Sequence, residues 1–328
     1  MTSGYGSYGT YRSELAVNVA CLMIFRVSDD LETRILKGVS RSFYLTLRIL
    51  PAPMRSAASV GYLLARTTDT IADTKGLPVE LRRELLMEYA GALTSADPLP
   101  HWPEAMLENV SMGERRLLER AGGVLEWLRK LEPQEQEMVR EVVATIIGGQ
   151  LMDLERFEDA APGSPVSLPD AASLDAYTWC VAGCVGAFWT KLGYHALGAR
   201  YSSADQATLL EKGIAYGKGL QLVNILRDLP EDLANGRCYL PVADPLDRGA
   251  LMHEFRTWHR IASGWVGEGL SYSGTLEARR LRTATVLPAL IAEETLEMLQ
   301  GVSWQSLQHR VKVPRRDVYR MFAEALFF

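Results

Sequence analysis

Two pairs of aspartates are the side chains of this sequence whose type and spacing could do chemistry. Asp69 and Asp73 enclose Thr-Ile-Ala, and Asp228 and Asp232 enclose Leu-Pro-Glu. On a helix, side chains four residues apart lie on one face, about 5–6 Å from each other. Carboxylates are ligands that Mg²⁺ prefers, completed by water and phosphate oxygens. Two such helices facing each other predict a magnesium site that holds phosphate groups from both sides.

An arginine accompanies each aspartate pair. Arg66 precedes the first pair by three residues, and Arg227 precedes the second pair by one. Carboxylates alone would repel an anion, whereas bridging cations and bidentate arginine donors would hold it. The combination predicts a site for a diphosphate bound through Mg²⁺.

Ionisation of an allylic carbon–oxygen bond is the chemistry that such a site favours. Mg²⁺ and arginine stabilise the charge that develops on a departing diphosphate. The carbocation left behind needs apolar walls that exclude water and aromatic faces that stabilise its charge. The candidates for this lining are Phe43, Tyr44, Tyr62, Tyr177, Trp179, Phe188 and Trp189.

A solvated helical face is the usual setting of a single Asp-x-x-x-Asp pair. Two occurrences, each beside an arginine and each in an otherwise apolar helix, favour the metal site instead. Pro230 lies inside the second motif. Because proline removes a backbone donor, we expect it to bend or end that helix, so the spacing argument is weaker there.

The whole-chain composition is that of a globular protein with a sizeable core. The 328 residues are 48% hydrophobic and 23% charged, and the net charge of −5 argues against nucleic acid as a partner. Four cysteines without a CxxC pair indicate a reducing setting. The apolar stretch from Leu15 to Phe25 is too short to span a bilayer and lacks the features of a signal peptide.

Helical periodicity dominates the elements that must position these side chains. We predict one all-α domain over residues 28–328, with helices around a central cavity, after a partly disordered Gly/Ser/Tyr-rich segment over residues 1–27. Gly38 is expected to end the first helix. The predicted helices span residues 28–37, 40–50, 53–73, 79–93, 103–130, 133–156, 170–198, 203–230, 246–269, 277–300 and 314–327.

Four segments together resemble the squalene/phytoene synthase family of head-to-head prenyltransferases. They lie in order between residues 40 and 241. The segments are Ser40-Arg41-Ser42-Phe43-Tyr44, Tyr62 to Asp69, Tyr177 to Gly186, and Gln221-Leu222-Val223-Asn224-Ile225-Leu226-Arg227-Asp228 with Gly236 to Pro241.

The resemblance implies an isoprenoid synthase fold and a role for each matching position. Asp69, Asp73, Asp228 and Asp232 would hold Mg²⁺, and Arg41, Arg66 and Arg227 would contact diphosphate or a cofactor phosphate. Tyr177, Arg66 and Arg227 are the implied catalytic residues. Lys312, Arg315 and Arg316 resemble a basic flap that faces NADPH. The implied substrate-binding residues are Ser40, Arg41, Phe43, Tyr62, Gln150, Gln221 and Asn224.

The implied reaction joins two molecules of farnesyl diphosphate. One ionises, and its cation is attacked by the double bond of the second to give cyclopropyl presqualene diphosphate. That intermediate ionises, rearranges and takes a hydride from NADPH to give squalene. Three segments are more similar in sequence to the squalene-forming branch than to the phytoene-forming one. They are Ser40 to Phe43, Arg66 to Thr70 and Leu281 to Leu296.

The sequence departs from the family pattern at several positions. Cys180 stands directly before Val-Ala-Gly, where better-known relatives have a tyrosine with a catalytic role, so Tyr177, another group or the released diphosphate must act instead. Ala72 stands where longer relatives have a glutamate, which removes one possible metal ligand. Pro314 interrupts the short basic flap, so the resemblance implies the condensation more strongly than it implies the use of NADPH. Gln150 and Asp153 could face the cavity, although Gly148 and Gly149 equally indicate close helix packing.

Other functions fit the motifs less well. Head-to-tail elongation uses Asp-Asp-x-x-Asp, and class I cyclisation uses a second motif of Asn, Ser/Thr and Glu. Phytoene, dehydrosqualene or hydroxysqualene formation without reduction remains open, as does a non-enzymatic helical scaffold. No apolar anchor precedes Phe328, which implies a soluble, bacterial-like version of the family. We expect a cytoplasmic protein and a monomer, with Met321 to Phe328 as a segment for peripheral membrane contact.

Overall fold

The computed structural model describes residues 31–40, 43–95, 97–309 and 311–327. Its helices in the first half are α2 (Leu31–Ser40), α3 (Phe43–Ile49), α4 (Ala52–Asp73), α5 (Val79–Thr94), α6 (Glu104–Asn109), α7 (Met112–Glu119), α8 (Ala121–Arg129) and α9 (Pro133–Arg156). Those in the second half are α10 (Ala171–Thr178), η1 (Trp179–Gly183), α11 (Cys184–Leu197), η2 (Gly198–Arg200), α12 (Gln206–Ala234), α13 (Arg248–Gly274), α14 (Arg279–Leu299), α15 (Trp304–Leu307) and α16 (Arg315–Ala325). The predictions for residues 1–30, including a disordered segment, lie outside the described residues.

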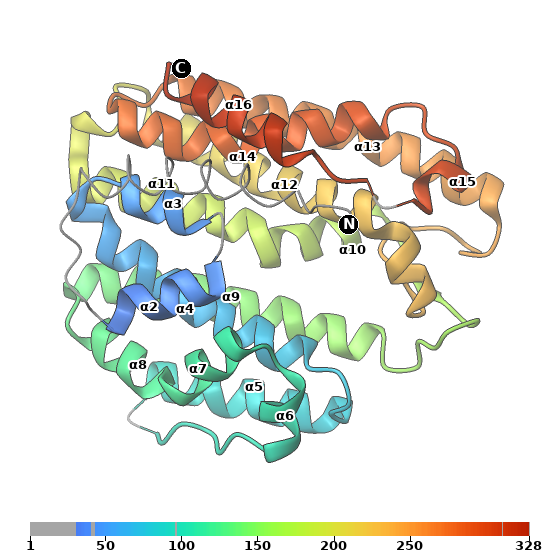
Figure 1. The fold of residues 1–328 in the computed structure, drawn as a ribbon, viewed down its shortest axis with the longest axis horizontal. Helices are drawn as coiled ribbons and strands as arrows, with labels where there is room; N and C mark the ends of the chain where they lie inside the picture. The colour runs from blue at the N-terminus through green and yellow to red at the C-terminus, as the bar shows by residue number, and fades with distance from the viewer. Residues whose placement is uncertain (1–30, 41–42, 96, 310, 328) are drawn as a thin grey trace, which may run out of the picture.

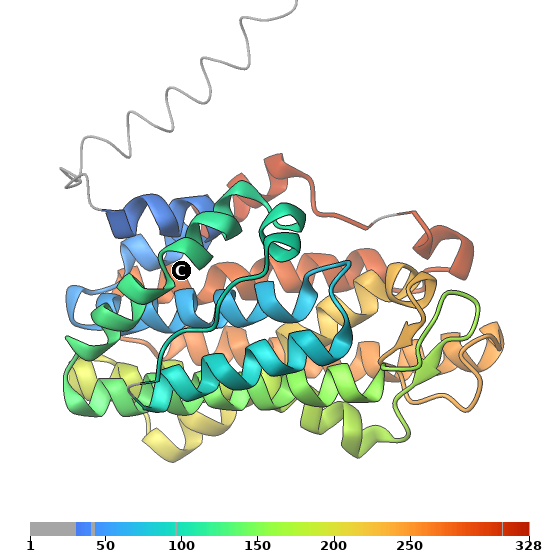
Figure 2. The same cartoon turned by 90° about the horizontal axis from the view of Figure 1, so that it is seen from below.

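The helices form two groups that face each other across the site described below. Helix α4 packs against α5, α8 and α9, and these lie in the lower part of Figure 1. Helix α12 packs against α11, α13 and α14 in the upper part. Figure 2 shows the same elements from below. Helices α9 and α11 contact each other and connect the two groups. The all-α prediction is confirmed.

The long helices α11 and α12 approach each other through glycines. A Cβ built on Gly186 would lie 1.9 Å from the carbonyl oxygen of Gly213, so neither helix could carry a side chain at this crossing. Just before this crossing, η1 is a single turn of π-helix, an irregularity that is frequent at functional sites. The local distortion lies directly after Tyr177.

Several predicted helix boundaries were wrong. Helix α2 continues through Gly38 to Ser40, and α12 continues through Pro230 to Ala234. The predicted helix over residues 103–130 is divided into α6, α7 and α8. The reason for one division is that Ser111 caps a new helix: its side chain accepts from Glu114 N, and the Glu114 side chain accepts from Ser111 N. Because α12 is continuous, Asp228 and Asp232 keep their one-face spacing.

Two very short strands place the segment after α12. Strand β1 (Val166–Ser167) pairs in parallel with β2 (Arg237–Cys238), with Val166 opposite Arg237. The pairing follows a tight turn at Gly236, whose φ of 85° is disfavoured for residues with a side chain. This small sheet directs Arg237 toward the end of α4.

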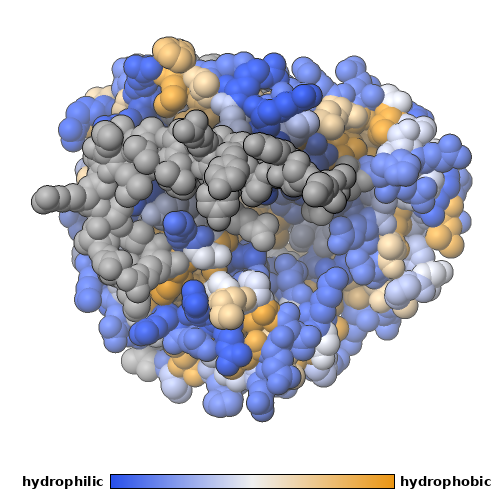
Figure 3. Space-filling view, viewed as in Figure 1, coloured by the Kyte–Doolittle hydropathy of each residue, from blue (hydrophilic) through white to orange (hydrophobic). Residues whose placement is uncertain are grey.

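One face of the molecule is mainly polar where the described residues form it (Figure 3). On the face shown in Figure 3, hydrophilic side chains predominate and apolar ones form small separate patches. Among the helices within the described ranges, none has an apolar run long enough to cross a bilayer. The apolar side chains instead form two large buried clusters, one centred on α4 and α9 and the other on α12 and α13.

Candidate active site

A cavity of about 400 Å³ lies between the two helical groups. Its walls come from α3, α4, α9, α10, η1, α11 and α12, together with Arg237 and Tyr239. One part of the lining is polar and contains Arg66, Asp69, Asp73, Gln150, Asp153, Gln221 and Arg237. The remainder is largely apolar and includes Leu47, Ala58, Val142, Ile146, Leu154, Val181, Val185, Phe188 and Trp189. Such a lining suits a ligand with a charged head and a hydrocarbon body.

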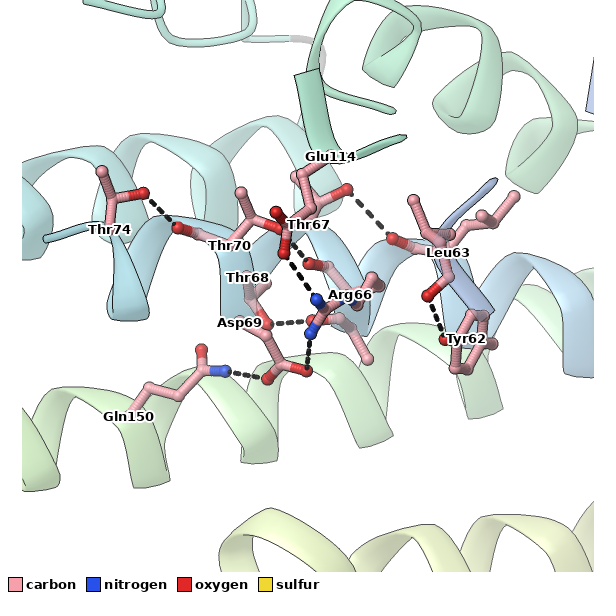
Figure 4. Close-up of polar contacts among 12 residues, drawn as sticks. Tyr62, Leu63, Arg66, Thr67, Thr68, Asp69, Thr70, Thr74, Glu114 and Gln150 are labelled. Atoms are coloured by element: carbon pink, nitrogen blue, oxygen red, sulfur yellow. Dashed lines mark hydrogen bonds and ion pairs between the residues drawn. The ribbon is translucent and has the colours of Figure 1, made fainter. Parts of the chain in front are cut away.

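The first aspartate pair lies in this polar part, at the end of α4. Gln150 Nε2 donates to Asp69 Oδ1 at 2.8 Å, and Arg66 Nη1 lies 3.8 Å from Asp69 Oδ2. Arg66 Nη2 donates to Glu114 Oε1 at 2.5 Å. Figure 4 shows Asp69 between Arg66 and Gln150, with Glu114 on the other side of the guanidinium. Side chains from α4 and α9 thus contact this carboxylate, and a side chain from α7 contacts Arg66.

Desolvation dominates the electrostatics of the first pair. Burial by the surrounding helices and the neighbouring charge of Asp73 raise the pKa of Asp69 to about 6, although 45% of its side-chain surface stays open to the cavity. Burial also raises the pKa of Asp73, against the opposing effects of Arg237 and Arg66. The positive charges of the protein therefore do not fully offset the cost of burying these two carboxylates in their ionised form.

The second aspartate pair lies on the face of α12 that begins at Gln221. Asn224, Asp228 and Asp232 follow Gln221 at helical spacing, and Gln221 lines the cavity. Asp228 is held by its own neighbour, since Arg227 Nε donates to Asp228 Oδ1 at 2.8 Å and Arg227 Nη2 donates to Oδ2. This hydrogen bonding raises the pKa of Arg227.

Asp228 and Asp232 are not among the residues that line the cavity, but Asp232 interacts electrostatically with Arg237 and Asp153, which are. Burial and the charge of Asp228 raise the pKa of Asp232 to about 7, while the nearby Arg237 opposes the shift and Asp153 adds to it. Asp153 in turn interacts with Asp73. The ends of α4 and α12 therefore face a shared cluster of charges, in which Arg237 is the central cation.

Arg237 was not among the predicted site residues, and Asp153 was named only as a residue that could face the cavity; both line it. Arg237 Nη1 lies 3.3 Å from Asp153 Oδ2, and burial raises the pKa of Asp153 to about 6. Burial works against the charged guanidinium, but Tyr239, Asp153 and Asp73 together raise the pKa of Arg237. The signals available in the sequence were the Gly-Arg-Cys-Tyr-Leu-Pro segment and the Gln-Leu-Met-Asp spacing.

The donor set fits Mg²⁺. Carboxylates with raised pKa values and the buried Asp153 Oδ1, which accepts no hydrogen bond from the described residues, are groups that a divalent cation would stabilise. Within the described residues, no three Asp, Glu, His or Cys side chains are close enough to hold a metal ion by themselves. Mg²⁺ commonly takes one or two carboxylates and completes its shell with water and substrate phosphates.

Comparison with known proteins agrees with this geometry. The model of the squalene/phytoene synthase family matches residues 36–317. The chain belongs to this family.

Curated relatives in this family are named for different activities. A presqualene diphosphate synthase of Zymomonas mobilis is 29% identical over 226 residues, which cover 68% of this chain and 64% of that protein. Squalene synthase ERG9 of Saccharomyces cerevisiae is 30% identical over 63% of this chain and 44% of that protein. A 15-cis-phytoene synthase of Synechocystis is 30% identical over 62% and 53%. The matches thus span less than two thirds of each relative.

Solved structures show that the fold is shared. The complex of TcSQS with the ligand E5700 has a TM-score of 0.73 at 23% identity, covering 90% of this chain and 85% of that one. A dehydrosqualene synthase in complex with a ligand has a TM-score of 0.58 at 19% identity and covers 97% of both chains. The isoprenoid synthase fold predicted from the motifs is confirmed.

Tyr177 lines the cavity of this family member, whereas Cys180 does not belong to the lining. The Tyr177 ring stacks on Tyr239 with ring centres 4.8 Å apart. Burial and the neighbouring Tyr239 raise the pKa of Tyr177 well above its usual range, so its hydroxyl keeps its proton. Cys180 instead faces α9, where its Cβ would lie 2.7 Å from a Cβ on Gly149. The position before Val-Ala-Gly is therefore a packing position here.

The other predicted aromatic lining residues divide into two sets. Tyr62, Phe188 and Trp189 line the cavity together with Tyr177. Trp179 is 37% exposed and lies outside the cavity lining, as does Tyr44, whose ring contacts Arg48.

The remaining predicted site residues that the structure describes do not line the cavity. Ser40 is buried, and its hydroxyl donates to the carbonyl oxygen of Leu36 on its own helix. Asn224 is exposed, and Lys312 and Arg315 are exposed at the start of α16. Arg41 lies outside the described residues, as does the side chain of Phe43 at the start of α3. Their roles stay predictions.

Proposed function

We propose that this chain joins two molecules of farnesyl diphosphate head to head to form presqualene diphosphate. The observation that carries the proposal is one cavity with carboxylates and arginines at one end and apolar walls over the rest. A prenyl diphosphate has the same division between a charged head and a hydrocarbon chain. The names of the relatives in Zymomonas mobilis and Rhodopseudomonas palustris support this product.

The residues of the chain would divide the work of ionisation. Asp69, Asp73, Asp228 and Asp232 would hold Mg²⁺, which neutralises the charge of the departing diphosphate. Arg66 and Arg237 would donate hydrogen bonds to diphosphate oxygens from the α4 side and the β2 side. In a site that excludes water these interactions act at full strength and need no reorganisation during the reaction.

Protection of the carbocation would fall to the apolar walls. Phe188 and Trp189 line the cavity, and the face of an aromatic ring attracts a cation. The protonated hydroxyl of Tyr177 can donate a hydrogen bond to released diphosphate. We propose that Tyr177 thereby keeps the leaving group in place while the cyclopropane ring forms, and that the released diphosphate takes up the proton that the second substrate loses as the ring closes.

A second apolar chamber supports the use of two substrate chains. It has a volume of about 200 Å³ and lies between η1, α11, α12, α13 and α14. Val181, Val185 and Trp189 line both this chamber and the main cavity. Two prenyl chains could therefore lie in adjoining spaces with their reactive ends near the shared residues.

Reduction to squalene with NADPH is the proposed second stage. The relative named squalene synthase ERG9 supports it, and Lys312 and Arg315 are exposed cations of the kind that contact a dinucleotide phosphate. Phytoene, dehydrosqualene or hydroxysqualene is the alternative product. The similarity to a relative named 15-cis-phytoene synthase and to the solved structure of a dehydrosqualene synthase supports that alternative.

Product analysis tests the proposal. Purified protein is incubated with farnesyl diphosphate and Mg²⁺, with and without NADPH, and the lipids are identified by mass spectrometry. We expect presqualene diphosphate without NADPH and squalene with it. Consumption of geranylgeranyl diphosphate while farnesyl diphosphate is untouched would favour phytoene formation. Unchanged ligand binding and function in Asp69→Ala would favour a scaffold.

We propose that the protein contacts a membrane peripherally, which would help to release an oily product. We also propose that it is a monomer. The C-terminal end exposes Tyr319 at 62%, Leu326 at 40% and Phe327 at 84%. Exposed aromatic side chains of this kind favour the interface of a bilayer. Sedimentation with lipid vesicles, compared between the wild-type protein and Phe327→Ser, tests this contact.

A further inference from the structure

We propose that Glu114 is a positioning residue that holds Arg66 at the diphosphate end of the cavity. The inference rests on the function proposed above and adds a residue from outside the metal and diphosphate motifs. Glu114 lies on α7, which belongs to the lower helical group in Figure 1 and does not line the cavity.

The Arg66 guanidinium lies between two carboxylates. Its Nη2 donates to Glu114 Oε1 at 2.5 Å, while its Nη1 is 3.8 Å from Asp69 Oδ2, beyond hydrogen-bonding distance (Figure 4). The Glu114 side chain is only 20% exposed, so water competes poorly for its charge. Glu114 therefore takes the strong contact and keeps Arg66 from closing on Asp69.

Glu114 is itself held in one orientation. Its Oε2 accepts from Ser111 N at 2.9 Å, which completes the cap of α7, while its Oε1 accepts from Arg66. The two oxygens thus have separate partners. A cap alone needs only the contact with Ser111, so the contact with Arg66 is an additional feature of this side chain.

Helix α7 is placed firmly enough to serve as an anchor. A Cβ on Gly113 would lie 2.5 Å from the carbonyl oxygen of Gly38, which shows how closely α7 approaches α2. Tyr62 OH donates to the carbonyl oxygen of Val39 at 3.2 Å and joins α2 to α4. Helices α2 and α7 therefore have fixed positions relative to α4. Through its contact with Glu114, the Arg66 side chain is fixed relative to both of these helices.

The consequence for the site follows from charge. Arg66 without Glu114 would be drawn onto Asp69, as Arg227 is drawn onto Asp228. An arginine in that position would neutralise a proposed magnesium ligand and would turn its donors away from diphosphate. Glu114 keeps the carboxylate available for the cation and the guanidinium available for the anion.

A double-mutant cycle tests this role. We compare the wild-type protein, Glu114→Ala, Glu114→Gln, Arg66→Met and the double variant by kcat/KM and by calorimetric binding of inorganic diphosphate with Mg²⁺. Glu114→Ala should lower kcat/KM by about tenfold to a hundredfold, since misplaced binding groups have effects of this size. Glu114→Gln, which is uncharged and whose single amide oxygen can keep only one of the two acceptor contacts, should fall between it and wild type. In the Arg66→Met background, Glu114→Ala should have no further effect.

Ser111→Ala is the matched control, because it weakens the cap without touching Arg66. It should lower the melting temperature by a few degrees and leave kcat/KM and diphosphate binding within about threefold. An equal loss in Ser111→Ala, or a full loss from Glu114→Ala in the Arg66→Met background, would overturn the positioning role.

The two proposals fail in different ways. If farnesyl diphosphate is not a substrate but diphosphate binds, the proposed reaction is wrong, and the calorimetric cycle still decides the role of Glu114. If the wild-type protein binds no diphosphate in the presence of Mg²⁺, both proposals are overturned.

Discussion

The aspartate pair on α4 and the pair on α12 share a spacing but differ in how the protein supports them. Asp69 is held by Gln150 from α9, and its arginine is held away by Glu114 from α7. Asp228 is paired with Arg227, the residue directly before it. The first pair thus depends on contacts between distant helices. In the second pair, Asp228 is satisfied within its own helix, whereas Asp232 interacts with Arg237 and Asp153 from other segments.

This difference indicates that the two pairs enter the reaction in different states. The α4 pair lies open to the cavity, with its carboxylates uncompensated and ready for a cation. On α12, Arg227 would have to release Asp228 before that carboxylate could bind Mg²⁺ in the proposed reaction. We infer that α4 forms the preorganised half of the site and that α12 completes it when the charged substrate arrives.

The largest expected effect tests whether both halves are needed. Asp69→Asn and Asp232→Asn should each lower kcat by about 10²–10³-fold, because each removes charge that would hold the cation. Asp159→Asn, an exposed aspartate outside the cavity, is the control and should change kcat little. The rate of farnesyl diphosphate consumption measures all three. If Asp232→Asn keeps wild-type activity, the α12 pair is a solvated face and the comparison fails.

The next effect compares the two arginines that accompany α12. Arg237→Met leaves Asp153, which is only 13% exposed, without its partner and should lower the free energy of unfolding by about 2–3 kcal/mol. Arg227→Met should cost about 1 kcal/mol or less, since Arg227 and Asp228 are each about one third exposed. Urea denaturation measures both. Equal losses would show that Arg237 is not the central cation of the cluster.

The pH dependence of stability reports the uncompensated charge directly. The pKa of Asp232 in the folded protein is about 7, above its ordinary value of 3.8, so the folded state binds the proton more tightly. Its contribution to stability is present below pH 4 and is lost as the pH rises through 7. Without Mg²⁺, Asp232→Asn should therefore melt a few degrees above wild type at pH 8 and equal to it or below it at pH 4.

Added Mg²⁺ and diphosphate should reverse that order. Ligands that bind only the folded state raise its melting temperature, and wild type keeps the carboxylate that binds them. At pH 8 we expect a clear rise for wild type and little rise for Asp232→Asn in differential scanning fluorimetry. An identical response of the two proteins would place the cation elsewhere.

Local patterns in the sequence predicted much of this site, while contacts between distant segments were not accessible. The spacing of Asp69 and Asp73 predicted a shared face because helix geometry alone determines it. Arg237 could not be recognised in the same way, since its position depends on a two-residue strand pairing with Val166. Glu114 had the pattern of an ordinary helix cap, and nothing local shows that its second oxygen reaches Arg66.

The smallest expected effect concerns Pro230, the residue that most distinguishes the two motifs. It was expected to bend or end its helix, yet α12 continues to Ala234, so the chain tolerates the lost backbone hydrogen bond. Pro230→Ala should raise the melting temperature by about 1–3 °C, because alanine restores a donor and is the best helix former. Activity should stay within about threefold, since Asp228 and Asp232 already share a face. A large loss of kcat with unchanged stability would show instead that a proline-dependent distortion aims Asp232 at the cavity, and the α12 pair would then be as specifically positioned as the pair on α4.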